Sequence, residues 1–184
     1  RTVDIRWRTR RAVSGLVRQM GDRTANTSRV SISSTDFDPM RLFIGIELPD
    51  GLRNNVAAVA SRVREDIARV APDAQVRWVP PSNLHITVWF LGEVREPRVE
   101  PLVGALTPPL DARSFTLRIG GGGAFPPTGA PRAIWLGLAS GREGLIAVHE
   151  QLRGRLVPLG FSPEARPYSP HLTVARVKEA RPPD

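Results

Sequence analysis

The 184-residue chain contains no cysteine and only three histidines. The absence of cysteine excludes a disulfide scaffold, a cysteine nucleophile and a thiolate metal site, and it is compatible with the reducing cytoplasm. No run of about 18 apolar residues is present, so the sequence predicts no membrane-spanning helix. The first residues carry arginines with no apolar segment behind them, which is unlike a secretory signal. We therefore expect a cytoplasmic protein without a membrane partner.

Lysine is also nearly absent, because Lys178 is the only one and all other basic residues are arginine. The net charge is nevertheless +8. A basic chain favours a polyanionic partner, RNA or DNA before an anionic membrane. Residues 1–39 hold eight arginines against four aspartates, which is half of that net charge. The charge permits a nucleic-acid partner without identifying one.

The composition changes near residue 40. Residues 1–39 are rich first in arginine and then in serine and threonine, with weak apolar periodicity. We predict that they form a poorly ordered extension outside the folded domain, with a basic arm that touches nucleic acid as the alternative. Residues 40–184 have a length that suits a single domain.

Hydrophobic periodicity predicts the order strand, helix, two strands, weak helix, two strands, helix, strand. The expected strands are 40–48, 74–79, 84–94, 114–125, 131–140 and 171–180, and the expected helices are 49–72, 99–110 and 143–161. Strands that adjoin without an intervening helix argue against a doubly wound α/β fold. The order predicts an α+β chain with antiparallel sheets and helices packed on their outer faces. The run Gly120–Gly123 lacks the Lys-Ser/Thr of a phosphate-binding loop and is interpreted as a flexible loop.

Two of the three histidines share a pattern, His-x-Thr-Val, in "HITV" and "HLTV". Because side chains alternate along a strand, His85 and Thr87 are expected on one face, and so are His171 and Thr173. The residues between them are apolar and suit a core. His149 lacks the pattern and falls beside the apolar face of a predicted helix, so we expect a structural or surface role for it.

Several readings of the two histidines are open. Each could be an ordinary hydrogen-bonded histidine in a strand. A zinc site would need a third ligand, which neither copy offers at metal-ligand spacing. A Ser-His-Asp triad needs one histidine, and no Gly-x-Ser-x-Gly elbow is present. A paired general acid and base fits two imidazoles, since one can be neutral and the other charged near neutral pH. Two such groups on opposite sides of a phosphorus atom suit in-line displacement.

These residues resemble the 2H phosphoesterases, whose signature is two His-x-Thr-x motifs. The segments "MRLFIGIELPD", "NLHITVWFLGEV", "PRAIWLGL" and "PHLTVARVK" look like the RNA 2′,3′-cyclic phosphodiesterase branch, also called 2′-5′ RNA ligase. The resemblance runs from Met40 to Lys178 and does not cover the extension. It implies a bilobal fold with two antiparallel sheets facing across a central cleft and helices on the outer faces.

The resemblance also implies an activity. Members hydrolyse a 2′,3′-cyclic phosphate to a 2′-phosphomonoester without metal or cofactor, and they can join RNA halves by a reversible, ATP-independent 2′-5′ linkage. By this likeness His85 would donate a proton to the leaving 3′ oxygen, and His171 would activate water. The substrate would be RNA with 2′,3′-cyclic phosphate ends, including tRNA fragments, or cyclic nucleotides, and the protein would be a monomer.

The remaining residues of the expected site bind substrate. The resemblance implies that the phosphate oxygens contact Thr87, Thr173 and Arg176, and that Tyr168 stacks on a base. Trp89 is expected to pack or to line the cleft. Two alternatives stay open: a binding module of the same fold with little catalysis, or a phosphodiesterase acting on small cyclic nucleotides or 2′-5′ oligonucleotides.

Overall fold

The computed structural model describes residues 16–18 and 39–178. The strands are β1 (Leu16–Arg18), β2 (Met40–Glu47), β3 (Val76–Trp78), β4 (His85–Val94), β5 (Arg118–Phe125), β6 (Ala133–Ser140) and β7 (Leu172–Val177). The helices are α1 (Asp50–Val70), α2 (Val99–Leu106) and α3 (Arg142–Leu156), with short 3-10 turns η1 (Pro81–Asn83), η2 (Glu96–Arg98) and η3 (Val157–Leu159). The order agrees with the predicted one from residue 40 onward.

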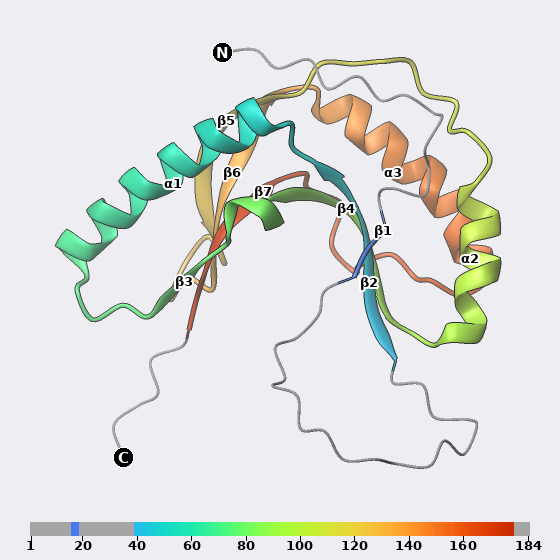
Figure 1. Cartoon of the computed structure of the whole chain (residues 1–184), viewed down its shortest axis with the longest axis horizontal. Helices are drawn as coiled ribbons and strands as arrows, with labels where there is room; N and C mark the ends of the chain where they lie inside the picture. Colours follow the sequence, from blue (N-terminus) through green and yellow to red (C-terminus); the bar gives the residue numbers. More distant parts are fainter. Residues whose placement is uncertain (1–15, 19–38, 179–184) are drawn as a thin grey trace.

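The strands form one antiparallel sheet made of two halves. The order across the sheet is β1-β2-β4-β7-β6-β5, and β3 also pairs with β7, beyond the point where β4 pairs with it. The two halves join where β4 and β7 pair through Ile86 and Leu172. Figure 1 shows the sheet arching at this junction, with α1 and α3 along its convex side. The prediction of an α+β, antiparallel fold with helices outside is confirmed, and the two sheets that were expected are the two halves of one continuous sheet.

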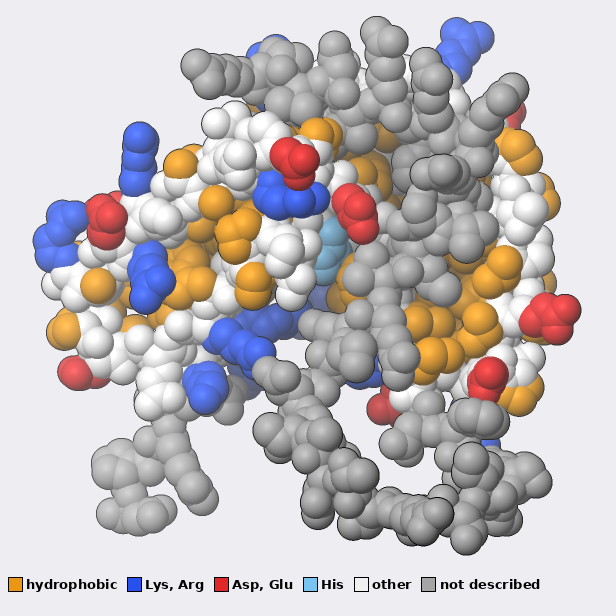
Figure 2. Space-filling model, in the orientation of Figure 1, with side chains coloured by type: hydrophobic (Ala, Val, Ile, Leu, Met, Phe, Trp, Pro, Cys, Tyr) orange, Lys and Arg blue, Asp and Glu red, His pale blue; other side chains and the backbone are white. Residues whose placement is uncertain are grey.

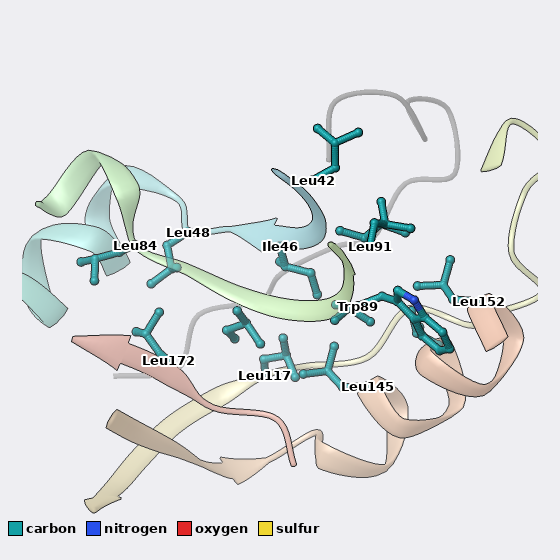
Figure 3. Close-up of a cluster of buried hydrophobic side chains, with 14 of the residues drawn as sticks. Leu42, Ile46, Leu48, Leu84, Trp89, Leu91, Leu117, Leu145, Leu152 and Leu172 are labelled. Atoms are coloured by element: carbon teal, nitrogen blue, oxygen red, sulfur yellow. The ribbon is translucent and has the colours of Figure 1, made fainter. Parts of the chain in front are cut away.

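The core lies between the convex side of the sheet and the helices. In β4 and β7 the buried residues include Ile86, Val88, Leu172 and Val174, as the alternation predicted. From α3 the buried side chains are the expected stripe of Leu145, Val148, Leu152 and Leu156. Figure 3 shows the Trp89 indole of β4 close to Leu152 of α3. Trp89 therefore packs in the core and does not line the open side of the sheet.

Each long helix crosses to the half of the sheet that it does not follow in sequence. Helix α1 follows β2, yet its Val59 and Val63 face Ile134 of β6 across an apolar groove of about 450 Å³. Helix α3 follows β6, yet its His149 contacts Trp89 of β4. These crossed contacts hold the two halves together and fix their relative orientation.

The glycine run lies within β5, so the prediction of a flexible loop is wrong. A Cβ added at Gly123 would lie 2.7 Å from Cζ2 of Trp135, and one at Gly122 would lie 2.9 Å from the Trp135 carbonyl oxygen. One at Gly120 would lie 2.9 Å from Cβ of Ala139. Gly120, Gly122 and Gly123 are needed because the neighbouring strand β6 approaches β5 too closely for side chains. Gly121 has open space around its Cβ, and its positive φ of 71° favours glycine.

The extension is described only at β1, which pairs with β2 from Leu16 opposite Ile44 to Arg18 opposite Leu42. The rest of the predicted extension, and with it the prediction of poor order, lies outside the described residues. Within those residues, no helix has the length and apolar character needed to cross a membrane.

Replacing Gly123 with alanine tests this close approach. Because the new Cβ meets the Trp135 ring, we expect Gly123→Ala to lower the free energy of unfolding by about 1–3 kcal/mol. Gly104→Ala is the matched control, since nothing lies within 4 Å of its Cβ in α2, and it should stabilise the protein by about 0.5–1 kcal/mol. Denaturant unfolding measures both. Equal effects of the two substitutions would contradict the packing described for β5.

Candidate active site

The pair formed by Ile86 and Leu172 brings the two His-x-Thr-Val copies side by side. In an antiparallel pair, the residues before one member lie opposite the residues after the other. Position 85 is therefore beside position 173, and position 87 beside position 171. Ile86 and Leu172 are fully buried toward the helices. The other four side chains, of His85, Thr87, His171 and Thr173, are partly exposed on the opposite side, which we call the histidine face.

Both imidazoles are held in the same way. Nδ1 of His85 lies 2.7 Å from the carbonyl oxygen of Asn83, and Nδ1 of His171 lies 2.7 Å from that of Ser169. A carbonyl oxygen only accepts hydrogen bonds, so each Nδ1 carries the proton and donates it. In the neutral ring Nε2 is then left unprotonated and able to take a proton. The backbone two residues before each histidine thus sets its tautomer.

The environment of His85 favours its neutral form. Burial lowers the pKa of His85 below 6.5, the hydrogen bond to Asn83 opposes this, the positive charge of Arg176 lowers the pKa further, and Glu47 raises it. Arg176 lies on β7 three residues after Thr173, which is the position beside His85. Arg176 therefore acts on the same part of the histidine face as His85 and Thr173.

A β-bulge follows each His-x-Thr and changes which residues share the histidine face. Opposite β2, Trp89 pairs with Ile44 and Thr87 with Gly45, so Val88 is the extra residue. Opposite β6, Ala175 pairs with Ile134 and Thr173 with Trp135, so Val174 is the extra residue. Each bulge reverses the alternation beyond it. Trp89 and Ala175 are consequently buried, whereas Phe90 and Arg176 are exposed.

Aromatic rings surround both histidines, and the sequence analysis did not identify them. The Phe43 ring stacks on His85 at 4.4 Å between centroids. Phe125 meets His171 edge-on at 5.0 Å, and Trp135 lies 6.2 Å from the same ring. Phe43 reaches His85 over Gly45, where a Cβ would lie 3.2–3.3 Å from both rings. A glycine two residues after an aromatic, in the strand beside the first motif, is the signal that could have indicated this contact.

Tyr168 has contacts other than the expected one. Its hydroxyl donates a hydrogen bond to the Thr87 carbonyl oxygen at 3.0 Å, and its ring stacks on His149 at 4.4 Å. Burial raises the pKa of Tyr168, so the hydroxyl stays protonated as this donation requires. One face of the ring is therefore occupied by His149. The hydroxyl ties the segment before His171 to the backbone of the first motif, and base stacking by Tyr168 stays a prediction.

His149 lies between Tyr168 and Trp89, whose ring centroid is 4.8 Å away. Its Nδ1 is buried without a hydrogen-bond partner, and the nearest acidic group is the Glu150 carboxylate at 3.6 Å. Burial lowers the pKa of His149 below 6.5, and the Glu150 charge opposes this shift. The structural role expected for this histidine agrees with its position in the core.

The described residues offer no other candidate for this chemistry. Between residues 39 and 178, no three His, Asp or Glu side chains are grouped so that they could hold a metal ion. The apolar groove beneath α1 is lined by residues such as Val59, Ile134 and Leu136 and contains no titratable side chain. The paired histidines, threonines and Arg176 are therefore the candidate site, since they group titratable rings, hydroxyls and a guanidinium on one face.

Comparisons with known proteins agree with this class. The family model described as LigT like phosphoesterase matches residues 51–135 and 136–184. The RNA 2′,3′-cyclic phosphodiesterase of Methanothermobacter thermautotrophicus is 36% identical over 143 residues, which cover 77% of this chain and 73% of that one. That of Escherichia coli is 32% identical over 142 residues, covering 76% and 73%. The chain belongs to the LigT-like 2H phosphoesterase family.

Solved structures lead to the same family. A Thermus thermophilus protein superposes with a TM-score of 0.64 at 30% identity, covering 78% of both chains. Apo LigT of Escherichia coli superposes with a TM-score of 0.57 at 31% identity, covering 78% of this chain and 76% of that one. LigT has also been solved in complex with 3′-AMP, and that structure has a TM-score of 0.56 at 29% identity, with the same coverage.

The buried His149 predicts a pH dependence of stability. Its pKa in the folded protein is below 6.5, so the unfolded chain takes up a proton first as the pH falls, and unfolding becomes easier below pH 6.5. We expect the melting temperature to drop between about pH 7.5 and about pH 5, and to drop less in His149→Phe, which keeps the ring contacts without titrating. Differential scanning calorimetry at both pH values measures this. The same drop in both proteins would show that His149 is not the cause.

Proposed function

We propose that the protein hydrolyses the 2′,3′-cyclic phosphate at the end of an RNA strand to a 2′-phosphomonoester. The observation that carries this proposal is the matched pair of imidazoles on the histidine face, each donating Nδ1–H to the carbonyl two residues before it. The curated relatives bear the name RNA 2′,3′-cyclic phosphodiesterase, which supports the same substrate class.

In the proposed reaction, His171 takes a proton from water through Nε2 as the water oxygen attacks phosphorus. The bond from phosphorus to the 3′ oxygen breaks, and His85 gives its proton to that oxygen. The phosphate stays on the 2′ oxygen. Thr87, Thr173 and Arg176 hold the non-bridging oxygens as negative charge develops.

This assignment requires a charged His85, whereas its pKa in the free protein is lowered. A bound phosphodiester brings a negative charge beside the ring and offsets the charge of Arg176, which raises the pKa again. Substrate binding would therefore favour the protonated form of His85, which is the form that acts as the acid. Running the same steps in reverse would join two RNA ends by a 2′-5′ linkage without ATP.

The proposed enzyme acts as a monomer in the cytoplasm, and a chain without cysteine is compatible with that reducing compartment. RNA ends, tRNA fragments among them, are the proposed substrates. Tyr168 is proposed to stack on a base of the substrate while its hydroxyl holds the Thr87 backbone.

Product analysis on an RNA oligonucleotide ending in a 2′,3′-cyclic phosphate tests this function. We expect a 2′-phosphate product, turnover that survives EDTA, and a loss of about 10²–10⁴-fold in kcat in His85→Ala and in His171→Ala. Asn55→Ala, exposed on α1, is the control and should retain turnover.

Three results would overturn parts of the proposal. Activity abolished by EDTA and restored by a divalent ion would contradict metal independence. Undiminished turnover in both histidine variants would remove the imidazoles from the mechanism. RNA binding by the wild type with no turnover would favour the binding module.

A further inference from the structure

Two arginines lie directly opposite each other where β3 pairs with β7. The register places Arg77 opposite Arg176. Residues directly opposite in an antiparallel pair point to the same face, with Cβ atoms about 4.5–5.5 Å apart. Both side chains are exposed. The flanking pair, Trp78 and Ala175, faces the core instead, so the alternation places both arginines on the histidine face.

This pairing is unfavourable in the protein alone, because like charges directly opposite each other destabilise a sheet. Among the ion pairs between residues 39 and 178, none joins Arg77 or Arg176 to an acidic side chain. Figure 2 shows Lys and Arg side chains gathered over the ends of β3 and β7, below a histidine. Negative charge bound beside the two guanidinium groups would relieve their repulsion.

The backbone at Arg77 is fixed on both sides. Val79 N–H donates to the Val174 carbonyl oxygen at 2.9 Å, and Lys178 N–H donates to the Gln75 carbonyl oxygen at 2.9 Å. These bonds continue the ladder past both ends of β3. The short strand therefore presents Arg77 at a defined place, one strand away from Arg176.

The position suits a second phosphate of the same substrate. Arg176 lies on β7 three residues after Thr173 and shares its face, so the reacting phosphate is assigned to Arg176. Neighbouring strands are about 4.8 Å apart, so Arg77 places a second guanidinium group on the same face, one strand beyond Arg176. Arg77 then lies beyond the reacting phosphate, where a mononucleotide has no anion to offer.

We propose that Arg77, paired with Arg176, binds the phosphodiester next to the cyclic phosphate end, so that the protein prefers oligonucleotides over mononucleoside cyclic phosphates. This inference rests on the proposed function for the identity of the reacting end. The contact is to the backbone, so it carries no sequence preference.

The test compares kcat/KM for a dinucleotide ending in a 2′,3′-cyclic phosphate with that for a mononucleoside 2′,3′-cyclic phosphate. We expect the wild type to prefer the dinucleotide and Arg77→Gln to lose about tenfold of that preference, the size expected for a charge-assisted hydrogen bond. Arg62→Gln, an exposed arginine on α1, should keep the wild-type preference. An unchanged preference in Arg77→Gln would overturn the proposal.

A binding measurement separates this inference from the proposed function. In the His171→Ala background, fluorescence anisotropy with the same two ligands should show that Arg77→Gln weakens dinucleotide binding and makes log K less dependent on salt, because one phosphate contact is lost. If the wild type has no turnover but Arg77→Gln still weakens dinucleotide binding, the second phosphate site is supported and the proposed reaction is contradicted. If binding and its salt dependence are unchanged, the site is wrong whatever the activity.

Discussion

The backbone pair between Ile86 and Leu172 is the contact on which the rest of the molecule depends. It joins the two halves of the sheet, and both side chains are fully buried beneath the crossed helices. Because side chains alternate, burying these two residues turns both His-x-Thr pairs to the other face. A slip of one residue would send the histidines into the core. Hydrophobic packing on the convex side therefore sets the geometry of the acid–base groups.

The two halves share a backbone pattern but carry different side chains on it. Val88 and Val174 are equivalent bulges, and each exposes the residue two positions later, which is Phe90 in one half and Arg176 in the other. In the antiparallel register, Arg176 lies toward His85, whereas Phe90 extends past Thr87. The same backbone device therefore presents a different side chain in each half.

Much of this arrangement could be predicted from the sequence, because it follows from periodicity. The strand period of two residues predicts the shared face of each His-x-Thr pair, and the helix period of 3.6 residues predicts the apolar stripe of α3. Together the two periods predict the order of elements. The bulges could not be predicted, since one extra apolar residue among apolar neighbours leaves the pattern unbroken. Simple alternation would bury Arg176 and expose Ala175. The glycine run was misread for a related reason: three of its four members face close contacts from the neighbouring strand β6, which the local sequence does not show.

The central claim is that both imidazoles donate through Nδ1 and react through Nε2. Nitrogen-15 NMR of the histidine rings over a pH titration measures this directly. The structure predicts that neutral His85 and neutral His171 both carry the proton on Nδ1, and that His85 titrates below 6.5. A proton on Nε2 of either neutral ring, or a His85 pKa above 6.5 in the free protein, would contradict it.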